Sequence, residues 1–133
     1  GEGTKQLNDI TKSENLPLQI IRLDVNDDKS VKDAVNTIVK EKDRIDVVVN
    51  NAGYDLMGAL EETSMEELKG QFETNLFGAI RVLQAVIPIM RKQKGGTIVN
   101  ITSLGGRVSF PLNSVYHATK FAFEGLSESI QYE

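Results

Sequence analysis

Short apolar runs alternate with segments of helical periodicity along this chain, and this alternation limits the folds open to it. The apolar runs predict strands, at 16–23, 45–50 and 97–102. Apolar side chains at three- and four-residue spacing and polar starts predict helices, at 4–14, 27–43, 64–91 and from about Asn113. Strands that alternate with helices are typical of a parallel α/β sheet, so we expect one such domain over 1–133.

Polar residues mark where two of these helices begin. Asp27 or Asp28 precedes the periodic segment that starts with Val31, and either carboxylate can accept from free backbone N–H groups as an N-cap. Ser64 and Glu67 have the spacing of a capping box. These signals predict helix starts near 28 and near 64.

Small polar residues follow each expected strand. Asp24 comes directly after the first run, Asn51 after the second and Ser103 at the end of the third. Parallel strands joined by right-handed crossovers have their carboxyl ends at one edge of the sheet, where ligands bind in open α/β folds. We therefore expect these three residues to meet at one site.

The last helix carries a pair of residues suited to proton transfer. Tyr116 and Lys120 are four residues apart, so they share a helix face, and Ser103 lies thirteen residues before the tyrosine. A phenol beside an ammonium group can exchange a proton with an alcohol or carbonyl oxygen. Cysteine is absent and His117 is the only histidine, so the sequence predicts no metal site of these residue types.

Four spaced motifs carry a family resemblance. NNAG at 50–53, NLFG at 75–78, ITS at 101–103 and YHATK at 116–120 resemble the classical short-chain dehydrogenases/reductases. The stretch from Ser103 to Ser129 is similar to the branch that contains hydroxysteroid and retinol dehydrogenases. The resemblance implies an NAD(P)-dependent oxidoreductase that interconverts a secondary alcohol and a ketone, or an alcohol and an aldehyde.

The resemblance also implies residue roles. Tyr116 is the general acid/base, Lys120 supports it and holds the nicotinamide ribose, Ser103 binds the substrate oxygen, and Asn75 fixes a helix bend in a proton relay. The implied catalytic residues are Asn75, Ser103, Tyr116 and Lys120, and the implied substrate contacts are Ser103 and Tyr116. The implied residues for NAD or NADP are Asp24, Val25, Asn51, Ala52, Gly53, Tyr116 and Lys120.

Parts of the family pattern have no counterpart in this sequence. The glycine-rich loop that receives the pyrophosphate is absent, because the GEG at 1–3 follows no strand and Gln6 stands where a third glycine belongs. We expect an incomplete Rossmann-like, doubly wound sheet that lacks the first two strands and the C-terminal part. The alternative is a non-catalytic fragment or a dimerising scaffold.

Charge and apolar patterning indicate the partners. A net charge of −4 without a basic stripe argues against nucleic acid, and no apolar run is long enough to span a membrane, so we expect a cytoplasmic protein. Apolar residues between Ser103 and Tyr116 favour a small hydrophobic alcohol or ketone as substrate. Wide apolar sets on the helix 64–91 and on the last helix predict a homodimer or homotetramer.

Other interpretations of the same residues remain open from sequence alone. Ser103 with His117 could belong to a serine hydrolase, although Ile101 replaces the first glycine of the G-x-S-x-G motif. Asp24 and Ser103 could be local turn residues, and Asn75 could be an exposed helical asparagine. His117 lies one position off the Tyr116 face, so we expect a surface or packing residue.

Overall fold

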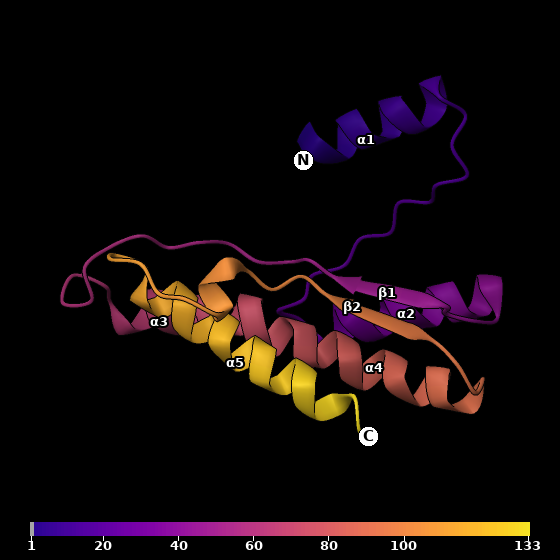
Figure 1. The fold of residues 1–133 in the computed structure, drawn as a ribbon. Coiled ribbons are helices and arrows are strands. Elements are labelled where there is room, and N and C mark those ends of the chain that lie inside the picture. Colours follow the sequence, from indigo (N-terminus) through magenta and orange to yellow (C-terminus); the bar gives the residue numbers. More distant parts are fainter. Residues whose placement is uncertain (1) are drawn as a thin grey trace.

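The computed structural model describes residues 2–133 and contains a two-stranded parallel sheet (Figure 1). Strand β1 (Val47–Asn50) pairs with β2 (Thr97–Asn100) in the register Val47 to Thr97 and Asn50 to Asn100. The predicted run 45–50 thus forms a strand over its last four residues, and the run 97–102 over its first four. A parallel pair needs a long crossover, and the helical segment 65–92 supplies it.

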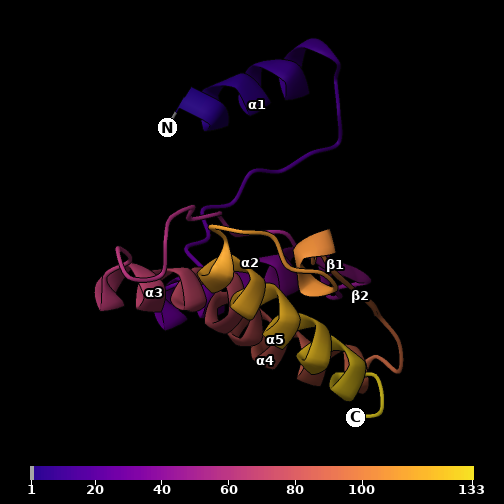
Figure 2. The same ribbon diagram turned by 60° about the vertical axis from the view of Figure 1, so that its left-hand side comes forward.

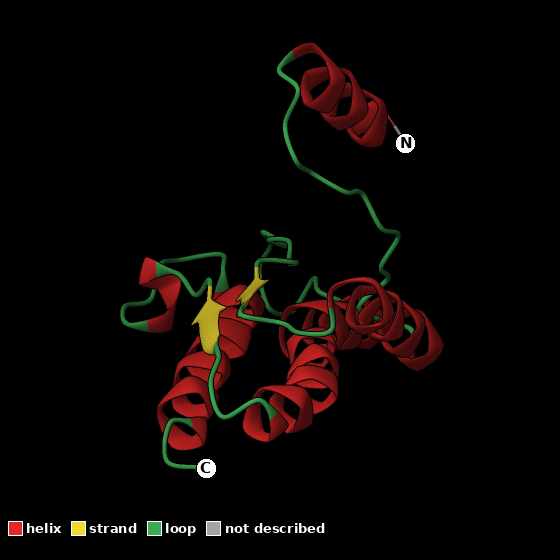
Figure 3. Cartoon of the chain, turned by 90° about the vertical axis from the view of Figure 1, so that its right-hand side faces the viewer, coloured by secondary structure: helices red, strands yellow, loops and turns green. Residues whose placement is uncertain are grey.

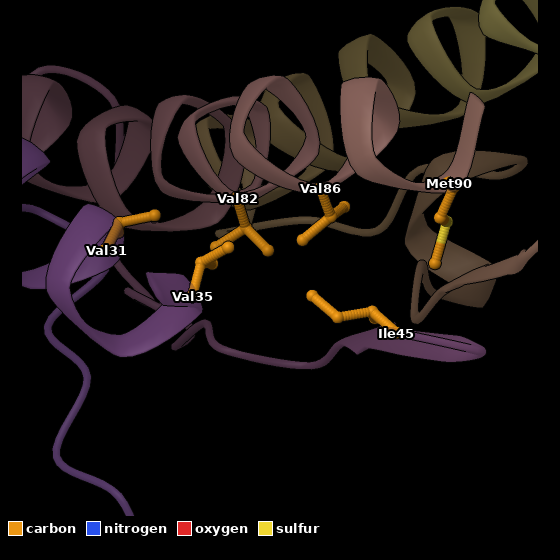
Figure 4. Close-up of a cluster of buried hydrophobic side chains, with 6 residues drawn as sticks. All are labelled: Val31, Val35, Ile45, Val82, Val86 and Met90. Carbon is orange, nitrogen blue, oxygen red and sulfur yellow. The ribbon is translucent and has the colours of Figure 1, made fainter. Parts of the chain in front are cut away.

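The helices cover one face of this sheet (Figure 3). Val48 and Ile98 pack against the helical core, whereas Val47 and Val49 on the opposite face are 57% and 55% exposed. Helix α2 (Asp28–Lys42) contacts α4 (Gly78–Lys92), and α4 also contacts β1. Figure 4 shows the buried side chains between these elements, which are Val31, Val35, Ile45, Val82, Val86 and Met90.

The predicted helix 64–91 is continuous but changes its winding. Helix α3 (Met65–Phe72) begins at the capping box of Ser64 and Glu67, as predicted. It passes through the π-helical turn η1 (Glu73–Phe77) into α4, which ends at Lys92. A π turn inside an α-helix widens the winding and is often found at functional sites. Here the turn holds Asn75, which is 1% exposed.

The last helix lies against a short glycine-containing turn. The 3-10 helix η2 (Leu104–Gly106) follows β2, and α5 (Ser114–Ile130) packs on it (Figure 2). A Cβ atom on Gly106 would lie 3.0 Å from the backbone oxygen of Lys120. This close approach requires glycine and brings α5 onto the end of β2.

The strand predicted at 16–23 is wrong. These residues form no strand, and Leu16, Leu18 and Ile20 are exposed. Among the described residues, no strand lies beside this segment, so its backbone has no ladder to join. The predicted helix 4–14 is present as α1 (Glu2–Ser13), which stands apart from the other elements and buries none of its residues (Figure 1).

None of the helices described for residues 2–133 has both the length and the apolar character that crossing a bilayer requires.

Candidate functional site

The carboxyl ends of the two strands are joined to α5 by amide side chains. The Asn50 Nδ2 group donates to Asn100 Oδ1 over 2.8 Å, and Asn100 Nδ2 donates to Ser127 Oγ over 2.9 Å. Asn50 is 8% exposed, so this link lies within the protein. It fixes the edge of the sheet against the helix that carries Tyr116 and Lys120.

Lys120 lies buried where β2 ends. Its side chain is 7% exposed, and Nζ donates to the Ile101 backbone oxygen over 3.0 Å. The same nitrogen lies 5.7 Å from the centroid of the Tyr116 ring. Burial lowers the pKa of the Lys120 ammonium below its ordinary value, because removal from water disfavours the charged form. Phenol and ammonium are therefore neighbours, as the four-residue spacing predicted.

A cleft of about 250 Å³ opens beside this pair. Its lining residues are Asn51, Gly53, Tyr54, Asp55, Ile101, Thr102, Tyr116 and Lys120. Four of them were named from the sequence, so loops after both strands and one face of α5 do meet at this edge. Tyr54, Asp55, Ile101 and Thr102 were missed, and only their positions directly after the strands could have indicated them.

Asn75 stabilises the loop after β1 through hydrogen bonds to its backbone. Its Oδ1 atom accepts from Tyr54 N at 2.9 Å, and Nδ2 donates to Tyr54 O at 2.8 Å and to Thr119 Oγ1 at 3.2 Å. A Cβ atom on Gly53 would lie 3.0 Å from Asn75 Oδ1, so the loop packs tightly on the amide. Asn75 is therefore a buried link between this loop and α5, not an exposed helical asparagine.

Gln71 supports the same loop and was not singled out from the sequence. It lies one helical turn before Asn75, is fully buried, and donates through Nε2 to Tyr54 O over 3.1 Å. Two buried amides thus fix one backbone carbonyl. A glutamine four residues before Asn75 on the same helix face was the available signal.

Ser103 does not line the cleft. Its Oγ atom accepts from Gly105 N at 3.0 Å and caps η2, which is the turn-forming role weighed from the sequence. Because the oxygen acts as acceptor in this bond, the hydroxyl proton is free to be donated elsewhere. Ala52 also lies outside the cleft lining.

Asp24 and Val25 lie away from the cleft, in contrast to the expectation that all three strand ends meet. Asp24 Oδ1 accepts from Asn26 N at 3.0 Å, which is a local turn bond. Val25 packs on α4, where a Cβ atom on Gly78 would lie 2.7 Å from Val25 Cγ2. The segment they belong to follows the unpaired residues 16–23, so no strand pairing carries it to the edge of the sheet.

Contacts with η1 and α4 hold this segment instead. Asn26 Nδ2 donates to Thr74 Oγ1 over 2.9 Å, and Arg81 pairs with both Asp28 and Glu73. Thr74 and Glu73 belong to the π turn that contains Asn75. One helical turn therefore contacts the Asp24 segment on one side and the Tyr54 loop on the other.

Known dehydrogenases and reductases are similar to this chain over most of its length. The family model described as short chain dehydrogenase matches residues 2–133. The chain is 43% identical to the 3-ketodihydrosphingosine reductase of Bacteroides thetaiotaomicron, covering 91% of this chain and 45% of that protein. It is 43% identical to human retinol dehydrogenase 8, covering 85% of this chain and 35% of that protein.

Solved structures show the same fold. A short-chain dehydrogenase from Streptomyces avermitilis superposes with a TM-score of 0.89 at 40% identity, covering 96% of this chain and 48% of that one. The structure of ElxO with NADP bound gives a TM-score of 0.87 at 36% identity, covering 94% and 51%. The chain thus spans about half or less of the proteins it matches, and their Rossmann-like fold confirms the predicted class. It belongs to the short-chain dehydrogenase family of oxidoreductases.

Proposed function

We propose that the intact protein is an NAD(P)-dependent oxidoreductase that interconverts a secondary alcohol and a ketone, or an alcohol and an aldehyde, with Tyr116 as general acid/base. One observation carries this proposal: Tyr116 and the buried ammonium of Lys120 line one cleft at the carboxyl ends of the strands. Family membership and the NADP in the related ElxO structure support it.

The donor set of the cleft fits a nicotinamide cofactor. The ammonium of Lys120 has three N–H groups, and one of them donates to Ile101 O. Two remain to bind ribose hydroxyls. Asn51 and Gly53 add an amide and a small residue to the cleft lining. Asp24, Val25 and Ala52 would lie toward the adenosine end of NAD or NADP, which supplies or accepts a hydride when bound.

The residues of this chain would handle the proton that accompanies hydride transfer. Reduction of a ketone adds a hydride to carbon and a proton to oxygen, and the Tyr116 hydroxyl donates that proton. Ser103 follows Thr102 of the cleft lining, and its free hydroxyl hydrogen would be donated to the same oxygen. The Lys120 charge stabilises the phenolate that remains, and its burial strengthens that interaction because water is excluded. Oxidation of an alcohol follows these steps in reverse.

Replacement of the phenol tests the proposal. Tyr116→Phe in the intact protein should lower turnover by about 100-fold or more, since general acid–base groups contribute about 10² to 10⁴. Cofactor binding, followed by calorimetry, should change little. Tyr132→Phe is the matched control, because Tyr132 is 86% exposed. Turnover retained above a few per cent in Tyr116→Phe would remove Tyr116 as the acid/base.

A hydrophobic substrate is the second part of the proposal. Four apolar side chains between Ser103 and Tyr116 are largely exposed, and they are Leu104, Val108, Phe110 and Leu112. Apolar side chains beside few polar groups favour hydrophobic alcohols and ketones. A panel of sterols, retinoids, acyl-ketones and sugars would test this, and a clear preference for sugars would contradict it.

We further propose that residues 1–133 belong to one catalytic domain of a cytoplasmic homodimer or homotetramer. On α5, Phe123 is 2% exposed and packs inward, whereas Phe121 is 45% exposed on another side of the helix. A large aromatic ring exposed on α5, together with the wide apolar sets of the two helices, supports an interface there. Sedimentation of the intact protein at micromolar concentration is the test, and a single monomeric species would reject the assembly.

A further inference from the structure

His117 has a more specific place in the structure than its sequence position suggested. It follows Tyr116 on α5, is 4% exposed, and does not line the cleft. Both ring nitrogens bond to backbone groups of the loop that connects Ser103 to Tyr116. The side chain is thus a packing residue with two directed polar contacts.

The backbone partners define which nitrogen carries the proton. Phe110 N donates to His117 Nε2 over 2.8 Å, so Nε2 must present a lone pair. The other nitrogen, Nδ1, lies 2.9 Å from Gly105 O, which can only accept. The two contacts are satisfied together by a neutral imidazole with its proton on Nδ1.

The Nδ1 contact leads directly to the proposed substrate-binding serine. Gly105 O accepts from His117, while Gly105 N donates to Ser103 Oγ over 3.0 Å. A Cβ atom on Gly105 would lie 2.6 Å from His117 Nδ1, so only glycine allows this approach. Fixing Gly105 fixes the direction from which Ser103 Oγ accepts, and therefore where its hydroxyl hydrogen can point.

The Nε2 contact holds the other end of the loop. The Phe110 ring lies 5.5 Å from the His117 ring, centroid to centroid, and is 49% exposed. Two residues later, Leu112 O accepts from Gly58 N at 2.8 Å, which joins this loop to the one after β1. His117 therefore bonds to both Gly105 and Phe110, which lie near the two ends of the apolar loop between Ser103 and Tyr116.

These contacts also exclude a direct chemical role for the ring. A general base needs a free nitrogen within reach of the reacting group, and both nitrogens of His117 are bonded to backbone. Ser103 Oγ bonds to Gly105 N and not to the imidazole. The serine–histidine pair of a hydrolase is therefore not formed in the described residues.

We infer that His117 is a positioning residue: as the neutral Nδ1–H tautomer it orients the Ser103 hydroxyl through Gly105 and holds the apolar substrate loop through Phe110. The inference rests on the proposed function, because it assigns His117 to the roles proposed there for Ser103 and the loop. It predicts two separable effects, one for each ring nitrogen.

Two amide variants distinguish the roles of the two His117 ring nitrogens. In His117→Gln the side-chain oxygen can take the place of Nε2 and accept from Phe110, but the donor to Gly105 is lost. In His117→Asn the amide nitrogen can take the place of Nδ1 and donate to Gly105, but the acceptor for Phe110 is lost. Ala118→Gln and Ala118→Asn are matched controls, since the neighbouring Ala118 is exposed.

Steady-state kinetics of the intact protein is the first readout. Loss of one neutral hydrogen bond corresponds to a change of roughly three- to tenfold in a rate or binding constant. We expect His117→Gln to lower kcat by that factor through Ser103, and His117→Asn to raise the substrate KM by that factor through the loop. Binding of ADP-ribose, measured by calorimetry, should stay unchanged in both. The inference would be overturned if both variants lowered kcat and raised KM by the same factors, or if neither variant changed either constant.

Nitrogen-15 NMR of the unsubstituted protein gives a readout that needs no activity. The His117 signals, identified by their loss in His117→Gln, should show a neutral ring protonated at Nδ1. A ring protonated at Nε2 would overturn the inference even if turnover is normal. An Nδ1–H ring in a protein that turns over no alcohol or ketone would instead reject the proposed function, and with it the catalytic part of this inference.

Discussion

Strand β1 and the segment 16–23 have similar apolar sequences and different structures. Val47–Asn50 pairs with β2 and has a helical core on one face. Residues 16–23 form neither strand nor helix, and their backbone makes local bonds such as the one from Leu18 N to Leu16 O. An apolar run alone thus does not make a strand, because a strand requires a partner for its N–H and C=O groups.

The same difference extends to the candidate site. Lys120 and Asn75 are buried and bond to the backbone of the loops that follow the paired strands. Asp24, which follows the unpaired segment, is exposed and lies in a region held through surface contacts such as Asn26 to Thr74. The proton-transfer half of the proposed site is therefore held by buried polar contacts, whereas the hydrogen bonds of Asp24 at the adenosine end are exposed.

Truncation of one isoleucine in each region gives the largest expected effect. Ile45 lies two residues before β1 and is 7% exposed in the core. Ile45→Ala should lower the free energy of unfolding by about 2–5 kcal/mol. Ile20 is 36% exposed, and Ile20→Ala should lower it by less than about 1 kcal/mol. Urea unfolding measures both. Equal losses would show that 16–23 is packed in solution and would remove the contrast.

Removal of the Asn75 amide tests the buried polar contacts of the paired side. Asn75→Ala leaves Tyr54 N without its acceptor and Tyr54 O with Gln71 alone, so we expect a loss of about 2–3 kcal/mol in unfolding free energy. Asn36→Ala is the matched control, because Asn36 is exposed on α2. Similar thermal unfolding of the two variants would contradict the assignment of Asn75 as a structural link.

A glycine pair tests how closely the Asp24 segment packs on α4. Gly78→Ala would place a methyl group 2.7 Å from Val25 Cγ2 and should cost about 1–2 kcal/mol, with local loosening of residues 24–28. Gly125→Ala on α5 meets nothing within 4 Å and should stabilise the helix by about 0.5–1 kcal/mol. Hydrogen exchange of residues 24–28 follows the loosening. If both substitutions stabilise the protein, the Val25 contact is not maintained in solution.

The pH dependence of stability gives the smallest expected effect. Burial lowers the pKa of Lys120 in the folded state, so between that pKa and the unfolded value of about 10.4 the unfolded chain binds more protons. Stability contributed by this site therefore rises with pH through that window. The unfolding free energy of the unsubstituted protein minus that of Lys120→Met should therefore increase from pH 8 to pH 10. A constant difference would show that the ammonium is not desolvated.

Local sequence signals predicted much of the fold and part of the site. The capping box at Ser64, the N-cap at Asp27 and the two paired strands follow from short-range chemistry, and all are present. Asp24 lies away from the cleft instead of meeting Asn51 there, because the strand expected before it has no pairing partner, and local sequence does not reveal such partners. Gln71 and the two bonds of His117 were missed, because a buried amide or imidazole has no periodic signature.

The sequence by itself determined the alternation of strands and helices, the four family motifs, and the four-residue spacing that places Tyr116 beside Lys120. These are local properties, since helical geometry and side-chain chemistry need only neighbouring residues. Only the tertiary structure decided that Asn75 lies within a π turn beneath Tyr54, and that Ser103 caps a turn held by His117. The Asn75 to Tyr54 and His117 to Gly105 contacts join residues 21 and 12 positions apart, and their geometry is set by packing that no local pattern encodes.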